Sequence, residues 1–470
     1  MASSASDQWE VRLTRLLDAQ RRAFQAARAP DRAARLVGLG ALKTALRAHK
    51  AGLIRAAAQD FGRRSAEETV IYDLGQVVQA INHLSRNLRR WMRPERRGLS
   101  WPFLPGRARV IYQPKGVVGV MAPWNYPYNL SLVPLATALA AGNRVMLKPS
   151  EHAPESARAM ARLLEECFDA DEVAVVQGDA VCGAAFAALP FDHLVFTGST
   201  AVGAKVMRAA AANLVPVTLE LGGKSPVIVM QGADLGRAAR DIAWGKIANA
   251  GQTCIAPDYA LVHEEDAGRL VSLLADEMAR LVPDGARDPK MTTIISQHHA
   301  DRLRGLLDDA RAKGAAVTEI GAGAAARAVA PAILAKAGPE MDVMREEIFG
   351  PLLPVLTYAS ADEAISFVIA RPRPLALYVY GPAGAARDAV LARTISGNVT
   401  VNGVMTHFGI ESLPFGGIGA SGIGAYHGRE GFLAMSHAKG VYYQPKFSMI
   451  PLGRVPGGRF ARLYAWFTMR

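Results

Sequence analysis

Residues 115–150, KGVVGVMAPWNYPYNLSLVPLATALAAGNRVMLKPS, hold the pattern that decides the fold. The short apolar run Val117–Met121 predicts a buried strand, Leu130–Ala141 predicts a helix, and Asn143–Leu147 predicts a second strand. Strands that alternate with helices at this spacing predict a parallel sheet covered on both faces, an architecture that binds ligands at the carboxyl ends of its strands.

The same alternation extends in both directions from this stretch. Apolar residues recur at helical intervals through the first 90 residues, which predicts a helical beginning. Downstream, the pattern predicts a helix at Pro154–Phe168 and strands at Val173–Gln177 and His193–Thr197. A second series implies a second α/β domain. Its predicted elements are strands at Pro226–Val229, Tyr259–Val262, Ala332–Leu334, Leu353–Leu356 and Ala376–Tyr380, with a helix at Leu235–Asn249.

The composition is that of a globular chain. Of 470 residues, 50% are hydrophobic and 20% are charged, which suits two or three domains and is too charged for many membrane spans. The net charge of +12 favours anionic ligands without choosing among them. Three cysteines form neither a disulfide framework nor a zinc pair, the N-terminus lacks signal-peptide character, and no apolar run approaches about 18 residues. We therefore expect a cytoplasmic protein without a transmembrane segment.

Three patterns suggest nucleotide or phosphate binding but have the wrong context. Gly417–Gly422 matches G-x-G-x-x-G, yet no strand precedes it and no βαβ unit follows. Gly223-Lys224-Ser225 resembles the end of a P-loop, but Thr218 stands where the first glycine is needed. The six arginines between Arg86 and Arg97 could contact phosphates, although such a cluster is more often a solvated helix end.

Three residues have neighbours that suit chemistry. Cys254 closes a flexible Gly-Gln-Thr-Cys run, which can present a thiol at a turn, although a cysteine taken alone is more often a small buried hydrophobe. Glu220 ends an apolar stretch before two glycines, so a strand end could deliver its carboxylate into a cleft, although most glutamates are solvated. Asn125 lies in a rigid aromatic loop, where its amide could donate to an oxyanion. The run Phe196–Gly203 is typical of an anion seat at a helix start, or of an ordinary capped helix.

Taken together, the ordered motifs between Tyr112 and Gly431 resemble the aldehyde dehydrogenase superfamily. The similarity to its class 3 branch, and within that branch to coniferyl aldehyde dehydrogenases, rests on QTCIAPDY at 252–259, SLPFGG at 412–417 and YHG at 426–428. The motifs shared with the whole superfamily are PWNY at 123–126, KPSE at 148–151, FTGSTAVG at 196–203, ELGGK at 220–224, GQTC at 251–254, EEIFGP at 346–351 and PFGG at 414–417.

The resemblance implies two doubly wound α/β domains and a small β oligomerisation arm. The NAD(P)-binding domain would comprise residues 1–94 and 114–222, with residues 420–438 returning to it, and the catalytic domain would comprise 223–419. The arm would comprise 95–113 and 439–446, and a C-terminal tail 447–470 would follow. Such arms usually join two subunits, so we expect a homodimer.

The resemblance also implies the chemistry. Cys254 attacks an aldehyde, Asn125 and the cysteine's own N–H hold the oxyanion, hydride passes to the nicotinamide, and Glu220 activates water to hydrolyse the thioester. Attack at neutral pH needs electropositive surroundings, because a free thiol has a pKa of about 8.5. The cofactor is expected to be NAD, with NADP as an alternative, and no metal is needed. The residues implied to bind the cofactor are Trp124, Lys148, Ser150, Glu151, Gly198, Ser199, Gly203, Leu221, Gly222, Glu347 and Phe349.

The substrate is expected to be an aromatic, coniferyl-type aldehyde or a medium- to long-chain aliphatic one. Tyr126, Tyr128, Ile255 and His407 are candidates to line its channel, because aromatic walls suit a flat apolar aldehyde. Two alternatives stay open. A CoA-acylating enzyme would transfer the acyl group of the same thioester to the thiol of CoA, and the presence of Glu220 argues against this alternative. A non-catalytic basic binding protein is supported only by the net charge and the arginine cluster. We expect no nucleic-acid partner.

The C-terminal tail is aromatic and basic. Its prolines and glycines leave no span of about 20 apolar residues, so it cannot cross a bilayer. A helix is predicted from Arg459 to Met469. This helix could lie on an anionic membrane surface or pack over a partner subunit near the substrate entrance, and we favour packing.

Overall fold

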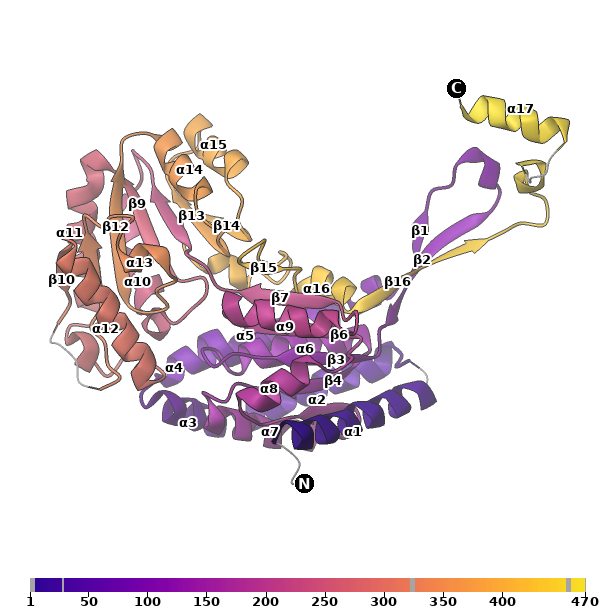
Figure 1. The fold of residues 1–470 in the computed structure, drawn as a ribbon, viewed down its shortest axis with the longest axis horizontal. Coiled ribbons are helices and arrows are strands. Elements are labelled where there is room, and N and C mark those ends of the chain that lie inside the picture. Colours follow the sequence, from indigo (N-terminus) through magenta and orange to yellow (C-terminus); the bar gives the residue numbers. More distant parts are fainter. Residues whose placement is uncertain (1–4, 28, 322–325, 454–457, 470) are drawn as a thin grey trace.

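Three β-sheets organise the chain. The computed structural model describes residues 5–27, 29–321, 326–453 and 458–469, and within these ranges it contains sheets of six, seven and three strands. The two larger sheets form two lobes, and the smallest extends from the first lobe as an arm (Figure 1). The predicted α/β fold class is confirmed.

The first lobe is built on a sheet with the strand order β15-β7-β6-β3-β4-β5, parallel except for the short β15. Every residue of β3 is buried, because helices cover both faces of a parallel sheet. This burial explains why a continuous apolar run, and not an alternating one, forms the strand. The strands are β3 (Val117–Met121), β4 (Arg144–Lys148), β5 (Val173–Val175), β6 (His193–Gly198), β7 (Val217–Leu221) and β15 (Gly422–Ile423).

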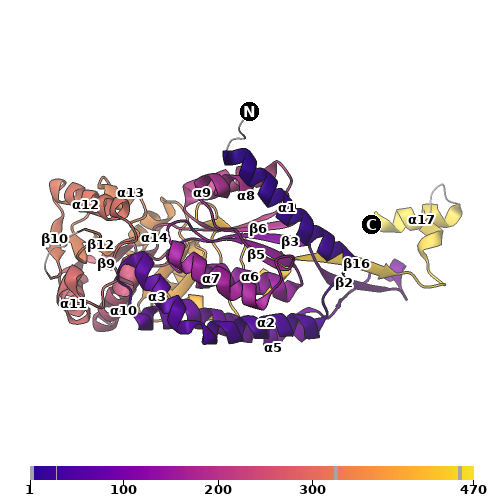
Figure 2. The same cartoon turned by 90° about the horizontal axis from the view of Figure 1, so that it is seen from below.

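Helices sandwich this sheet. Figure 2 shows α1, α8 and α9 on one face and α2, α5, α6 and α7 on the other. A π-helical turn, η1, interrupts the N-terminal helices directly before α5. The helices are α1 (Ala5–Ala26), α2 (Arg32–Ala48), α3 (Lys50–Phe61), α4 (Ala66–Glu68), η1 (Thr69–Leu74), α5 (Gly75–Trp91), α6 (Asn129–Ala141), α7 (Pro154–Cys167), α8 (Ala180–Ala187), α9 (Thr200–Ala211) and α16 (Gly428–Ala434).

The second lobe has a sheet with the order β10-β11-β12-β9-β8-β13-β14, parallel except for the edge strand β10. Its strands are β8 (Pro226–Val229), β9 (Tyr259–His263), β10 (Ala316–Glu319), β11 (Ala332–Ala335), β12 (Leu352–Tyr358), β13 (Ala376–Tyr380) and β14 (Asn398–Val401). Its α-helices are α10 (Leu235–Ile247), α11 (Ala267–Leu281), α12 (Gln297–Ala312), α13 (Asp342–Arg345), α14 (Ala361–Ile369) and α15 (Ala385–Arg393). Short 3-10 turns in this part of the chain are η3 (Ala248–Gly251), η4 (Glu264–Asp266), η5 (Gly285–Arg287) and η6 (Thr406–Gly409). Two further 3-10 turns lie outside the lobe, η2 (Trp101–Phe103) between the first two strands of the arm and η7 (Ile450–Gly453) in the tail.

Helix α10 ends two residues earlier than its sequence pattern predicts. Asn249 and Ala250 have φ angles of 48° and 53°, which is left-handed backbone that an α-helix cannot contain. Gly251 continues this conformation at φ +71°, and an added Cβ there would lie 2.3 Å from the carbonyl oxygen of Gly350. A glycine is therefore required at this position, and the chain turns sharply just before Cys254.

The arm is an antiparallel sheet of β1 (Glu95–Arg97), β2 (Arg107–Pro114) and β16 (Ser436–Tyr443). Helix α17 (Arg459–Thr468), close to the predicted bounds, lies near the tip of the arm (Figure 1), where the rings of Tyr464 and Trp101 are 5.9 Å apart. Tail residues 454–457 and 470 lie outside the described residues. None of the helices described is long and apolar enough to cross a membrane.

Candidate active site

Cys254 lies where two cavities meet. The first, of about 220 Å³, is lined by the ends of β6 and β7 and by residues near α12, and we call it the strand-end cavity. The second, of about 210 Å³, has mainly aromatic and apolar walls, and we call it the aromatic cavity. Cys254 and Leu130 line both. A nucleophile at this junction can contact a ligand in each cavity at the same time.

Most of the predicted catalytic and cofactor residues come together in the strand-end cavity. The Trp124 and Phe349 rings meet there edge to face, with centroids 5.4 Å apart. His299 and Arg302 of α12 also line this cavity, and no sequence motif indicated them. The predicted residues that line it are Trp124, Asn125, Gly198, Ser199, Glu220, Leu221, Gly222, Cys254, Glu347 and Phe349.

Four predicted cofactor residues lie outside this cavity. Lys148, Ser150 and Glu151 are at or just beyond the end of β4, where the Lys148 ammonium donates to the Glu151 carboxylate over 2.9 Å. Gly203 lies in α9, where an added Cβ would come within 2.5 Å of the Leu221 side chain. Gly203 therefore allows α9 to pack closely against β7.

Hydrogen bonds fix the loop that carries the thiol. The Gln252 side-chain amide donates to the Asn249 carbonyl over 2.9 Å, and its oxygen accepts from the Ile295 N–H over 2.9 Å. The Glu68 carboxylate accepts from the Asn249 N–H and, over 2.5 Å, from the Thr292 hydroxyl. A glutamate of the first lobe thus holds the left-handed turn of the second lobe.

Asn125 belongs to the same network. Its Nδ2 donates to the Gln252 carbonyl over 3.0 Å, beside the thiol loop. Its own carbonyl accepts from Arg64 Nη1 over 2.8 Å and from Asn249 Nδ2 over 3.0 Å. Arg64 is buried and lies 3.7 Å from Asp73, which is also buried. The Asn125 amide is therefore positioned by residues from both lobes, which leaves one of its N–H groups for a ligand.

Two carboxyl groups approach the thiol. Glu220 projects from β7 with 2% of its surface exposed, and neither of its carboxyl oxygens has a hydrogen-bond partner. Burial raises the pKa of Glu220 well above its ordinary value. Burial, reinforced by Asp258, raises the pKa of Glu347 to about 8. Gly222 leaves the space that the Glu347 carboxylate occupies, since an added Cβ would lie 2.0 Å from it.

The surroundings of Cys254 differ from the electropositive setting that the sequence suggested. Burial raises the pKa of the thiol, and the carboxyl groups of Glu347 and Glu220 raise it further. The backbone N–H groups of Cys254 and Ile255 lower it, but their effect is smaller. The unliganded site therefore keeps its sulfur protonated at neutral pH.

Two of the four predicted substrate contacts line the aromatic cavity and two do not. Tyr126 and Ile255 line it. Tyr128 does not, because it is fully buried in the first lobe and donates its hydroxyl to the Leu53 carbonyl over 2.7 Å. His407 is also buried, bonded to the Thr400 hydroxyl at 2.9 Å, and its neighbours line the cavity in its place. The full lining is Tyr72, Gln76, Tyr126, Asn129, Leu130, Trp244, Thr253, Cys254, Ile255, Met405, Thr406, Phe408 and Gly409.

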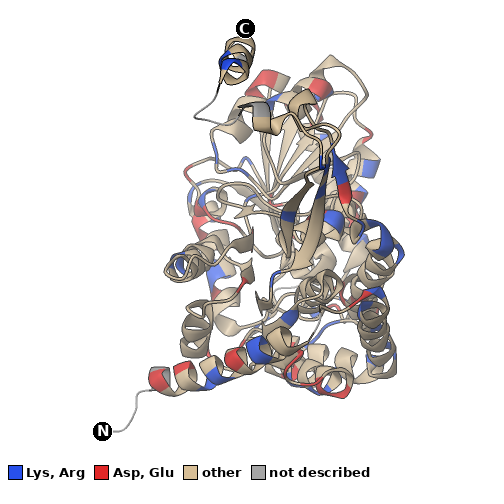
Figure 3. Cartoon of the chain, turned by 90° about the vertical axis from the view of Figure 1, so that its right-hand side faces the viewer, with Lys and Arg blue, Asp and Glu red and all other residues tan. Residues whose placement is uncertain are grey.

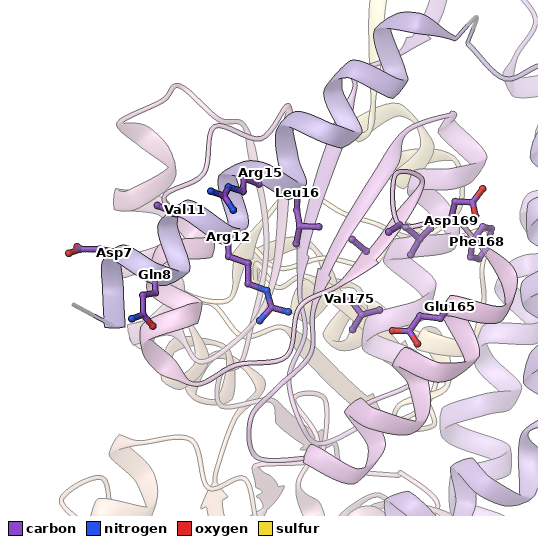
Figure 4. A pocket seen from close by; sticks show the side chains of 13 residues that line it. Asp7, Gln8, Val11, Arg12, Arg15, Leu16, Glu165, Phe168, Asp169 and Val175 are labelled. Carbon is purple, nitrogen blue, oxygen red and sulfur yellow. The ribbon is translucent and has the colours of Figure 1, made fainter. Parts of the chain in front are cut away.

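A larger hollow of about 830 Å³ lies away from this chemistry, between α1 and the edge strand β5 (Figure 4). Arg12 and Arg15 line it from α1, and Glu165 and Asp169 line it from the end of α7 and the loop after it. None of the predicted catalytic or cofactor residues borders it. The candidate active site is therefore chosen for its thiol and carboxyl groups and not for the size of its cavity.

Charge is dispersed outside the site. Figure 3 shows segments of both signs interspersed over the side from which the arm extends. In the arginine-rich stretch, Arg97 pairs with Glu95 at 2.8 Å, and Glu95 also pairs with Arg429 at 2.7 Å. Over the described ranges, no group of three or more His, Cys, Asp and Glu side chains could hold a metal ion.

Comparisons with known proteins agree with this geometry. A model of the aldehyde dehydrogenase family matches residues 4–441. The chain is 46% identical over 447 residues to a probable coniferyl aldehyde dehydrogenase of Pseudomonas aeruginosa, covering 95% of this chain and 94% of that protein. It is 48% identical over 395 residues to a coniferyl aldehyde dehydrogenase of a Pseudomonas species, covering 83% and 82%. A solved structure described as the substrate-bound state of Staphylococcus aureus AldH matches with a TM-score of 0.91 and 34% identity, covering 97% of this chain and 99% of the other. The chain belongs to the aldehyde dehydrogenase family.

Proposed function

We propose that this NAD(P)-dependent aldehyde dehydrogenase oxidises an aromatic, coniferyl-type aldehyde to its carboxylic acid, with Cys254 as the nucleophile. The observation that carries this proposal is the position of Cys254 between an aromatic cavity and a cavity lined by the carboxyl groups of Glu220 and Glu347. The first cavity suits a flat aryl group, and the second holds the groups that the chemistry needs.

The strand-end cavity fits a nicotinamide cofactor. Thr197 Oγ1 and the Glu220 carboxyl oxygens are buried there without hydrogen-bond partners, so a polar ligand would satisfy them. Trp124 and Phe349 supply flat walls, and Ser199 caps the helix that begins beside the cavity. When bound, NAD(P) supplies the acceptor for the hydride lost by the substrate.

Asn125 and Cys254 would carry out the first half of the reaction. The Cys254 thiol first loses its proton to water. Its sulfur then adds to the aldehyde carbon and forms a C–S bond, while the carbonyl oxygen becomes an alkoxide. The free N–H of the Asn125 amide stabilises this oxyanion, and its bond to the Gln252 carbonyl fixes the direction in which the amide points. Loss of hydride from the same carbon leaves an enzyme thioester.

Glu220 would carry out the second half. Its carboxylate takes a proton from a water molecule, the hydroxide adds to the thioester carbon, and the C–S bond breaks to release the carboxylic acid and the thiolate. A buried carboxyl group with a raised pKa is a stronger base once ionised than a solvated one. This base favours hydrolysis over transfer of the acyl group to CoA.

Replacing the proposed base should separate the two halves of the reaction. Glu220→Gln keeps the size of the side chain but cannot accept a proton, so one equivalent of NAD(P)H should form in a burst while steady-state turnover falls by about 10²–10⁴-fold. Stopped-flow absorbance of the reduced cofactor measures both. Cys254→Ala is the matched control, with neither burst nor turnover but retained cofactor binding. Wild-type turnover by Glu220→Gln would exclude the base role.

The raised pKa of Cys254 predicts that its thiol reacts slowly with alkylating agents at neutral pH. Because only the thiolate reacts, and because burial moves its formation to higher pH, alkylation of the unliganded enzyme by iodoacetamide should be slower at pH 7 than that of free cysteine. The rate should continue to rise above pH 9. Peptide mass spectrometry distinguishes Cys254 from Cys167 and Cys182. Alkylation of Cys254 at pH 7 as fast as that of free cysteine would contradict the inferred surroundings.

Glu151 should set the cofactor preference. Its carboxylate can accept from the adenosine ribose hydroxyls and would repel a 2′-phosphate, so we expect kcat/KM to be higher with NAD than with NADP. Glu151→Gln should reduce the ratio of the two kcat/KM values, while Glu155→Gln, on α7 and paired with Arg158, should leave it unchanged. A higher kcat/KM with NADP in the wild type would show that Glu151 does not face the ribose.

We also propose that the chain forms a homodimer through the arm and the tail. In support, the arm and the tail expose large apolar side chains that a partner subunit could cover. Truncation after Lys446 should shift the dimer towards monomer or change the substrate range, measured by sedimentation velocity and kinetics. Anionic-vesicle binding that is lost with the tail, with dimer and kinetics unchanged, would favour the membrane-surface interpretation. The exposed residues are Trp101, Phe103, Tyr443, Phe447, Phe460, Leu463, Trp466 and Phe467.

A further inference from the structure

The turn at residues 346–350, which brings Glu347 and Phe349 to the strand-end cavity, contains strained backbone. Phe349 has a φ angle of 48°, in the left-handed region that residues with a side chain enter only at a cost in free energy. Such a conformation persists only where neighbouring groups hold it from several sides. The position of the Phe349 ring in the cavity therefore depends on the groups that hold this turn.

Arg302 of α12 holds the turn through its guanidinium group, and it lines the strand-end cavity itself. Its Nη1 donates to the Glu346 carboxylate over 3.0 Å and to the Glu347 carbonyl over 3.2 Å. Its Nη2 donates to the Ile348 carbonyl over 2.5 Å. A guanidinium group carries its donors in a rigid planar fork, so this one side chain fixes the two consecutive carbonyls that precede Phe349.

Two residues of the second lobe hold other atoms of the turn. The Asp258 carboxylate accepts from the Ile348 N–H over 2.9 Å. The Lys224 ammonium donates to the Glu346 carbonyl over 2.9 Å. Arg302 bonds instead to the carbonyls of the next two residues, so its contribution is distinct from theirs.

Helix α12 limits the position of Phe349 in two further ways. An added Cβ on Gly350 would lie 2.3 Å from the Leu303 side chain, so the helix packs directly on the residue that follows Phe349. The His299 ring lies 5.5 Å from the Trp124 ring, and Trp124 in turn meets Phe349 edge to face at 5.4 Å. One helix therefore holds the backbone on both sides of Phe349 and contacts the ring against which Phe349 packs.

We propose that Arg302 is a positioning residue for hydride transfer, because its guanidinium fork holds the turn that places the Phe349 ring against the nicotinamide. This inference rests on the proposed function and adds a residue that belongs to none of the sequence motifs. The hydride carries two electrons from the substrate carbon, which becomes the thioester carbon, to the nicotinamide ring. A displacement of about 1 Å can slow such a step by about 10²-fold. A relaxed turn at Phe349 would therefore slow hydride transfer although every reacting group is still present.

The step can be isolated in a Glu220→Gln background, in which the proposed reaction stops at the thioester. Stopped-flow absorbance with saturating NAD measures the rate constant and the amplitude of the first turnover. Arg302→Gln should lower the rate constant by about 10–100-fold and leave the amplitude at one equivalent, whereas partial unfolding would lower the amplitude. Arg302→Lys keeps the positive charge without the fork and should be nearly as slow. A wild-type rate constant in Arg302→Lys would overturn the proposal, because charge alone would then suffice.

A matched control and a double-mutant cycle show whether Arg302 acts through Phe349. Arg311→Gln removes an exposed arginine that pairs with Asp308 on the same helix, and it should leave the rate constant unchanged. Phe349→Leu should slow the first turnover, and addition of Arg302→Gln should cause no further loss, because the ring that the turn positions is already absent. An unchanged rate constant in Phe349→Leu, or two effects that multiply, would overturn the proposal.

A binding measurement separates failure of this role from failure of the proposed function. Calorimetric titration with NADH needs no turnover, and we expect Arg302→Gln and Phe349→Leu each to weaken binding, with no further loss in the double variant. Aldehyde oxidation by the wild type, combined with losses of affinity that multiply, would overturn the role of Arg302 and retain the proposed function. Coupled losses of affinity in an enzyme that oxidises no aldehyde would overturn the proposed function and retain the placement of Phe349 by Arg302.

Discussion

The Asn125 carbonyl is the point on which the site depends. It accepts from Arg64 of the first lobe and from Asn249 of the second, while its side chain reaches Gln252 beside the thiol. Left-handed backbone at Asn249 costs free energy, and it persists because these bonds and the Glu68 carboxylate hold it from both lobes. Arg64 is itself buried beside Asp73, where removal of one partner of such a pair typically costs about 3–5 kcal/mol. These bonds therefore hold the two lobes together at the candidate active site.

The carboxyl groups proposed to act in catalysis also affect the free energy of unfolding. The folded protein raises the pKa values of Glu220 and Glu347, so each group favours folding while it is protonated at low pH. That contribution is lost as the pH rises, for Glu347 through its folded pKa of about 8. Burying the Glu220 carboxyl group beside a thiol without a hydrogen-bond partner is unfavourable for stability, and the nearby carboxyl groups of Glu220 and Glu347 raise the pKa of the sulfur. Catalytic sites commonly show this trade-off.

Sequence patterns predicted most of the buried parallel strands closely, because strands covered on both faces need continuous apolar runs, as in Val117–Met121. They gave no prediction for β10 and β14, which form the two edges of the seven-stranded sheet. They also indicated Cys254, Glu220 and Asn125 as candidates, since motif order carries information that single residues lack. They did not distinguish residues that tertiary packing separates: Tyr126 and Tyr128 are both aromatic, but only Tyr126 lines the aromatic cavity, and His407 is buried between neighbours that line it. His299 and Arg302 line the strand-end cavity and gave no signal, because they belong to none of the motifs.

The proposed covalent role of Cys254 can be tested directly. Wild-type enzyme mixed with NAD and an aromatic aldehyde, quenched in acid within milliseconds and digested, should give a Cys254 peptide heavier by the acyl group of the corresponding acid. The adduct should accumulate further in Glu220→Gln, because hydrolysis is the step that this substitution slows. Catalytic turnover with an unmodified Cys254 peptide at every quench time, in both proteins, would contradict the account.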